Sequence, residues 1–163
     1  MNFNKLRFNK QHISGFSDLV VTLARKPGSW NIDIIINSQT DEIMFKPGFY
    51  FFVDKQTGEG LNVYTVGRQR VNEKFRTNYG LYTIINKIQA PKYKPAAKLK
   101  RHLSAKTQIE VYYVSMENAK YLTNKVGKQG TLFGKLAKTE TDIYNNMHEV
   151  KSRIKDNYSF KYN

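Results

Sequence analysis

Lysine and arginine side chains that could bind phosphate are concentrated in two stretches of the sequence, residues 92–106 and residues 125–135. These stretches contain Lys92, Lys94, Lys98, Lys100, Arg101, Lys106, Lys125, Lys128 and Lys135. Such cations contact phosphate oxygens, and Gly127, Gly130 and Gly134 would let backbone N–H groups approach a phosphate closely. The residue types therefore predict non-covalent binding of a polyanion.

The charge balance of the whole chain favours the same kind of partner. The 163 residues include 27 Lys plus Arg against 13 Asp plus Glu, a formal net charge of +14. A polyanion would relieve this self-repulsion; nucleic acid is the commonest candidate and an anionic membrane the next, although no clean basic amphipathic helix supports a membrane binder. Without a zinc-finger or other recognition motif, we expect double-stranded DNA to be bound with little sequence specificity.

The stretch KPGFYFFVDKQTGEGLNVYTVGRQR, residues 46–70, could instead carry hydrolytic chemistry. Gly48-Phe49-Tyr50 begins one apolar run, and Tyr64-Thr65-Val66-Gly67 ends the next. This order resembles the GIY-YIG endonuclease module, in which two tyrosine-bearing strands precede a helix with an arginine and a later helix with a metal-binding glutamate. The resemblance implies a hairpin with the shape of that module.

The same resemblance implies roles for four residues if the protein is a nuclease. Tyr50 or Tyr64 would position or deprotonate water. Arg76 would stabilise phosphate charge, and Glu149 would hold a Mg²⁺ ion. Further candidates for the last two roles are Arg68, Arg70 and Glu140.

Two departures from the module argue against catalysis. Thr65, in strict register with the following Val-Gly, stands where the second tyrosine is expected, and Tyr64 would point to the opposite face of the strand. Glu149 lies off the apolar stripe of its predicted helix and is expected to be a solvated surface carboxylate. We therefore expect no enzyme activity, no catalytic or metal-binding residue and no cofactor. A metal-dependent GIY-YIG-type DNA endonuclease is the alternative, and only this alternative calls for Mg²⁺.

Apolar periodicity predicts the elements that must position these residues. Alternating or β-branched runs predict strands at residues 18–24, 30–36, 49–53, 61–66 and 109–115, with the first four forming two hairpins. Apolar spacings of three and four predict two helices, over residues 71–88 and over residues 143–154; Gly80 weakens the first, and Pro91 stops it. A further short helix is expected after Pro95. These elements predict an α+β fold: a small, mainly antiparallel sheet built from hairpins, with a GIY-YIG-like central hairpin, packed by two or three helices.

We expect a single domain over residues 1–163, with residues 1–17 a flexible or edge segment and residues 18–163 the DNA-binding core. The chain has no cysteine, which excludes disulfides and thiolate zinc sites. No apolar run has the length of a membrane span, so no transmembrane segment is expected. The single Trp30, next to the turn at Gly28, is expected to fill the core rather than to serve as a platform on which bases stack.

From about Asp18 to the C-terminus the chain is similar to the nucleoid disruption protein family of T4-type bacteriophages. The motifs that carry this resemblance are KPGFYF, VGRQR, VYYVSMENAK, GKQGTL and MHEVKSRIKDNYSFKY, in this order. The resemblance implies an early phage protein that binds double-stranded DNA and disorganises the host bacterial nucleoid without cleaving it. It also implies a place in the host cytoplasm, at the nucleoid, with host nucleoid-associated proteins as candidate further partners and no small-molecule substrate.

The family resemblance does not assign DNA contacts to residues. The candidate DNA-binding set therefore rests on charge and position, and adds four residues to the two basic stretches. These are Arg68, Arg70, Lys74 and Arg76.

Overall fold

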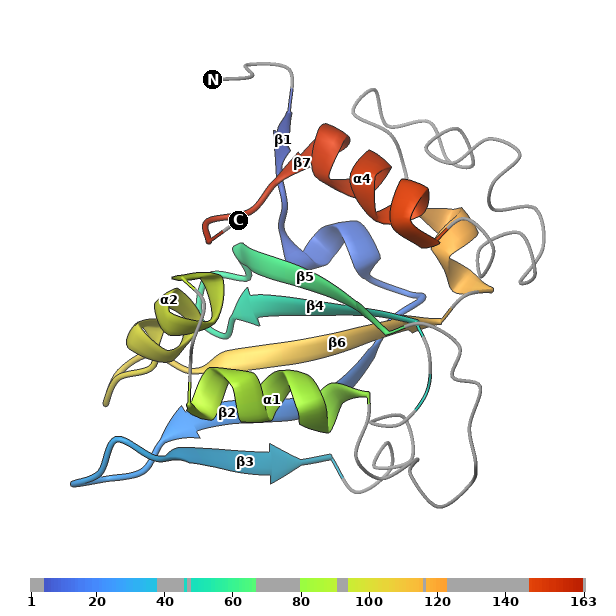
Figure 1. Ribbon diagram of the computed structural model, residues 1–163. Helices are drawn as coiled ribbons and strands as arrows, with labels where there is room; N and C mark the ends of the chain where they lie inside the picture. The colour runs from blue at the N-terminus through green and yellow to red at the C-terminus, as the bar shows by residue number, and fades with distance from the viewer. Residues whose placement is uncertain are drawn as a thin grey trace.

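The computed structural model describes residues 5–37, 46, 48–66, 80–90, 94–115, 117–122 and 147–162. Its centre is a five-stranded antiparallel sheet with the strand order β3-β2-β6-β4-β5. The strands are β2 (Asp18–Arg25), β3 (Ile32–Ile36), β4 (Gly48–Asp54), β5 (Gly60–Val66) and β6 (Ile109–Ser115). Helices cover both faces of this sheet (Figure 1). The predicted α+β class and both predicted hairpins are confirmed, whereas the likeness to a GIY-YIG module stays a resemblance.

Strand β4 supplies the centre of two separate apolar cores. All seven of its residues are buried, because the sheet is covered on both faces. Successive side chains of a strand point to opposite faces, so Tyr50 and Phe52 enter one core while Phe49, Phe51 and Val53 enter the other. This explains why residues 49–53 are all apolar, four of them aromatic, and do not alternate with polar residues.

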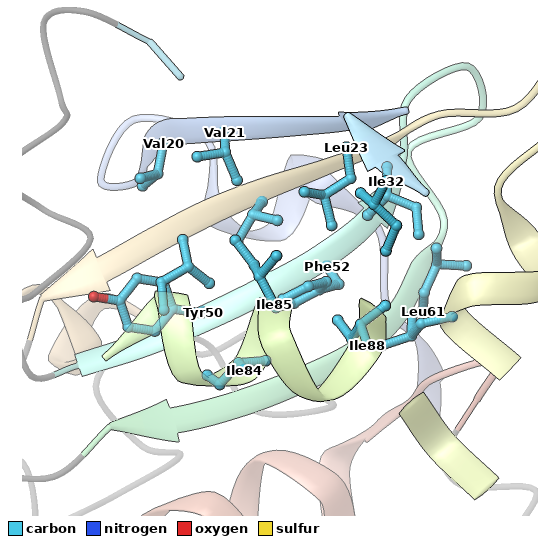
Figure 2. Packing of buried hydrophobic residues seen from close by; sticks show 14 of the residues in the cluster. Val20, Val21, Leu23, Ile32, Tyr50, Phe52, Leu61, Ile84, Ile85 and Ile88 are labelled. Atoms are coloured by element: carbon cyan, nitrogen blue, oxygen red, sulfur yellow. The ribbon is translucent and has the colours of Figure 1, made fainter. Parts of the chain in front are cut away.

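Helices α1 (Leu81–Gln89) and α2 (Lys94–His102) cover the first face of the sheet. Figure 2 shows Ile84, Ile85 and Ile88 of α1 lying over Phe52 and its neighbours on the strands. The predicted helix through Gly80 is corrected, because Gly80 has φ +80° and is the N-cap residue directly before α1. Residues 71–79 of the predicted helix lie outside the described residues. A positive φ is accessible to glycine and ends regular helix geometry there.

The second face of the sheet is covered by segments from both ends of the chain. Helix α4 (Met147–Asn157) packs there with the short helices η1 (Lys10–Ile13) and η4 (Asn118–Tyr121). Strands β1 (Leu6–Arg7) and β7 (Tyr158–Ser159) pair in parallel beside them (Figure 1).

Part of the N-terminal segment, for which the sequence predicts a flexible or edge position, lies in the second core. Phe8 and Ile13 are fully buried, and the ring of Phe8 stacks on Phe51 with centroids 4.8 Å apart. Apolar side chains at wide spacing do not form a strong local pattern, so this packing has little signature in the sequence. The ordered core thus includes residues before Asp18.

Candidate nucleic-acid interface

Helix α2 separates its apolar and basic side chains onto different faces. Ala96 and Leu99 are buried against the sheet, whereas Lys98 and Arg101 are exposed. Pro95 lies in the first turn, where its missing N–H leaves no helical hydrogen bond unmade. Because residues three apart in a helix are neighbours, Lys98 and Arg101 present two cations side by side to the solvent.

The loop after α2 adds a third exposed cation, Lys106. The Ser104 and Thr107 hydroxyls are 2.7 Å apart, and Ser104 Oγ accepts hydrogen bonds from the Lys106 and Thr107 N–H groups, each at 3.2 Å. The Thr107 hydroxyl also donates to the carbonyl of His102. These bonds order the backbone that carries Lys106. Lys98, Arg101 and Lys106 are called the α2 basic surface below.

Lys100 belongs to the same basic stretch but has a structural role. Its Nζ donates a 2.6 Å hydrogen bond to the carbonyl oxygen of Gln89, in the last turn of α1. A cation is favourable at this end of a helix, where carbonyl groups lack helical partners. Lys100 therefore links α2 to α1. It is half-buried, whereas Lys98 and Arg101 are exposed.

Gln89 also ties this region to the turn between β2 and β3. Its side-chain oxygen accepts a 2.7 Å hydrogen bond from the Ile32 N–H, and its side-chain nitrogen lies 3.3 Å from Asn31 Oδ1. The β2–β3 turn, the end of α1 and α2 thus lie at the same end of the sheet (Figure 1).

Trp30 projects from this turn into solvent, so the prediction that it fills the core is wrong. Its exposed fraction is 71%, and the guanidinium of Arg25 lies 4.1 Å from the centre of its ring. Strand pairing ends with Arg25 opposite Ile32, and Trp30 lies beyond that pair. A side chain beyond the last pair has no facing strand or helix to cover it.

A buried network that has no signature in the sequence fixes the end of α2. His102 Nε2 lies 2.6 Å from Asp54 Oδ2, and His102 Nδ1 lies 2.8 Å from the hydroxyl of Tyr162. Asp54 Oδ1 accepts the N–H groups of Gln56 and Thr57, each at 2.9 Å. Burial opposes ionisation of Asp54, but the hydrogen bonds from Thr57, His102 and Gln56 together hold its pKa below the usual value.

Local sequence patterns do not reveal this network, since its three side chains come from segments far apart in the chain. It links the end of β4, the end of α2 and the C-terminal segment. Both ring nitrogens of His102 are engaged, so this histidine holds the helix that carries the α2 basic surface.

Of the two candidate tyrosines of the nuclease alternative, one is fully buried and the other half-buried. Tyr50 is fully buried and its hydroxyl donates a 2.6 Å hydrogen bond to the carbonyl of Lys46. Tyr64 lies directly opposite Tyr50 in the β4–β5 register, so the two side chains share a face of the sheet. Burial raises the pKa of both phenols, for Tyr50 with a further contribution from Tyr113. A raised pKa keeps a phenol protonated at neutral pH, which is unfavourable for a general base.

Glu149 belongs to the other layer of the fold. It is an exposed residue of α4, the helix that packs on the second face of the sheet, and its Oε1 lies 3.5 Å from Arg153 Nη2. Tyr50 and Tyr64 face the first core. The structure therefore does not bring Glu149 together with the two tyrosines.

The side chains of the remaining candidate cations are not among the described ones. Lys94 begins α2, but its side chain is not among the described ones. The following candidates lie outside the described residues: Arg68, Arg70, Lys74, Arg76, Lys92, Lys125, Lys128 and Lys135. Within the described ranges, no group of three or more His, Asp or Glu side chains is arranged to hold a metal ion. Over the same ranges, no helix is long and apolar enough to cross a membrane.

The described residues form a basic α+β fold with exposed cations on helix α2 and an exposed tryptophan in the turn between β2 and β3. Over residues 10–163 the sequence matches the family described as T4-like phage nuclear disruption protein (Ndd). The match covers most of the chain, so the protein belongs to this bacteriophage family. No curated protein and no solved structure matches the chain.

Proposed function

We propose that this protein binds the double-stranded DNA of the host bacterial nucleoid with little sequence specificity and disorganises the nucleoid without cleaving its DNA. The observation that carries the proposal is the α2 basic surface. Helix α2 contains no acidic residue, and among the described residues no carboxylate forms a salt bridge with Lys98, Arg101 or Lys106. Cations without a carboxylate partner are available to phosphate.

Phosphate contact accounts for both affinity and low specificity. Each lysine or arginine that neutralises a phosphate releases condensed counterions, which favours binding whatever the base sequence. The net charge of +14 extends this attraction over the whole molecule and speeds association. The family description, a phage nuclear disruption protein, supports the host nucleoid as the place of action.

In the proposed mechanism, the protein occupies phosphate groups of the DNA backbone. A protein that covers phosphates along the host chromosome competes with host nucleoid-associated proteins for the same sites, in the host cytoplasm. Binding of this kind requires no cofactor and no metal ion.

A gel-shift assay with supercoiled plasmid, run across a salt series with and without Mg²⁺ or Mn²⁺, tests the proposal. The test protein carries Lys98→Gln, Arg101→Gln and Lys106→Gln. The control carries Arg7→Gln, Lys120→Gln and Arg153→Gln, which remove the same charge from β1, η4 and α4. We expect the test variant to lower the slope of log affinity against log salt by about 0.9 for each cation lost.

Two results would overturn the proposal. The first is the absence of a salt-dependent shift of the plasmid by the wild-type protein; an equal loss of affinity in the test and control variants would remove only the special role of the α2 basic surface. The second is metal-dependent nicking of the plasmid that disappears in Glu149→Gln, which would establish the nuclease alternative.

A further inference from the structure

The turn between β2 and β3 presents an aromatic side chain to solvent. At 71% exposure, Trp30 is the most exposed large apolar side chain among the described residues. Burial of an indole is favourable, so an indole left in water is a candidate for a binding contact. Trp30 is therefore available for a contact with a binding partner.

The turn holds Trp30 in a defined position. The Lys26 N–H donates to the Asn31 carbonyl at 2.9 Å, and the Asn31 N–H donates to Ser29 Oγ at 3.0 Å. Gly28 adopts φ +69°, a conformation that suits glycine in a tight turn. Gln89 then anchors Asn31 to α1. A contact made by Trp30 therefore costs little ordering of the backbone.

The chemistry around the indole indicates an anionic partner. The guanidinium of Arg25 lies over the ring, held by a 3.0 Å hydrogen bond from its Nε to the Ser29 carbonyl. Lys26 is exposed in the same turn. Through Gln89 and Lys100 this turn is joined to α2, so its cations lie at the same end of the sheet as the α2 basic surface.

We propose that Trp30 inserts as a wedge at a base-pair step of double-stranded DNA and stacks on a base with the ring face that Arg25 leaves open, while Lys26 contacts a flanking phosphate. The inference rests on the proposed function and adds an activity to it, because a wedge partly unstacks and kinks the duplex. Each bound protein then unwinds or bends DNA locally. Such deformation explains how a DNA-binding protein disorganises a chromosome without breaking strands.

The first test measures contact, using the fact that Trp30 is the single tryptophan of the chain. A short duplex is added to the full-length protein and tryptophan fluorescence is followed. Stacking on bases is expected to quench the emission. Stronger quenching by a single-stranded oligonucleotide than by the duplex would overturn the wedge. A change in tryptophan fluorescence with vesicles of anionic phospholipid, and none with the duplex, would also overturn it.

The second test measures deformation with Trp30→Ala and a matched control, Tyr121→Ala. Tyr121 is also exposed and also lies beside a cation, with Lys120 Nζ 5.2 Å from its ring centre, but it belongs to η4. Closed circular plasmid is relaxed by a type I topoisomerase at equal occupancy of each protein. Wild type and Tyr121→Ala are expected to change the linking number, whereas Trp30→Ala leaves it unchanged.

A measurement of DNA affinity distinguishes the wedge proposal from the proposed function. Trp30→Ala is expected to bind about tenfold more weakly with the salt slope unchanged, because stacking involves no counterion release. If wild type binds with a normal salt slope but Trp30→Ala matches it in linking number and affinity, the wedge is refuted and the proposed function stands. If wild type does not bind plasmid, both fail.

Discussion

The carboxylate of Asp54, at the end of β4, and the imidazole of His102, at the end of α2, form a contact of 2.6 Å in the interior of the protein. Both side chains are about nine-tenths buried, and the hydroxyl of Tyr162 completes the network from the C-terminal segment. The helix that carries the α2 basic surface is thus fixed at its last residue. A buried hydrogen bond to a charged group is worth more than a neutral one, so this contact should be measurable in stability.

Stability should depend on pH through Asp54. Its pKa is lowered in the folded protein, so its contribution is present above the ordinary carboxyl pKa and is lost as pH falls through the lower folded value. We expect Asp54→Asn to cost about 2 kcal/mol at neutral pH and progressively less below pH of about 4. Denaturant unfolding between neutral and acidic pH measures this. The exposed Asp156→Asn is the control, and a loss independent of pH in Asp54→Asn would contradict the account.

Neighbouring lysines in α2 should have separable effects. Lys98→Gln is expected to weaken DNA binding in a salt-dependent way and leave stability within about 0.5 kcal/mol of wild type. Lys100→Gln removes the hydrogen bond to the Gln89 carbonyl and should cost about 1 kcal/mol of stability. Thermal unfolding and gel shift on the same two preparations test the contrast. Equal stability of the two variants would show that the Lys100 contact contributes nothing.

The glycine of the Gly-Phe-Tyr motif should be needed for packing. A Cβ atom at Gly48 would lie 2.4 Å from Cε1 of Tyr113 and 2.8 Å from the carbonyl oxygen of Val114. Overpacking of this kind costs about 1 to 3 kcal/mol, so Gly48→Ala should unfold at lower denaturant concentration. Gly15→Ala is the control. Its φ of +90° is positive, as is the φ of +156° at Gly48, but no atom lies within 4 Å of its added Cβ. A smaller loss at Gly48 than at Gly15 would refute this explanation.

The tyrosine of the same motif should also prove structural. Tyr50→Phe keeps the buried ring and removes the hydroxyl that donates to the Lys46 carbonyl at 2.6 Å. We expect a loss of about 1 kcal/mol in stability and no change in plasmid binding or plasmid integrity. Chemical denaturation and the gel assay measure these effects. Loss of a metal-dependent cleavage activity in Tyr50→Phe, with stability unchanged, would point instead to catalysis.

Much of the fold could be predicted from the sequence because the relevant patterns are local. β-Branched and aromatic runs separated by turn residues predict β2 through β6. The short helix expected after Pro95 is α2, which begins one residue earlier, at Lys94. The excess of cations over carboxylates is also a property of composition, so the amino-acid sequence alone is enough to propose the class of partner. Gly80 marks the limit: the sequence indicates a weak helix position, but the positive φ of this glycine sets the start of α1.

Only the tertiary structure could decide which side chains are free to bind and which hold the fold. Lys98 and Lys100 are both lysines of the same helix, yet Lys98 is exposed whereas Lys100 donates a hydrogen bond to the Gln89 carbonyl. Trp30 is hydrophobic by type but is exposed, because it lies beyond the last strand pair. The contact between Asp54 and His102 joins residues 48 positions apart. Residue type and local spacing determine secondary structure and total charge, whereas exposure and long-range contacts depend on how the layers pack.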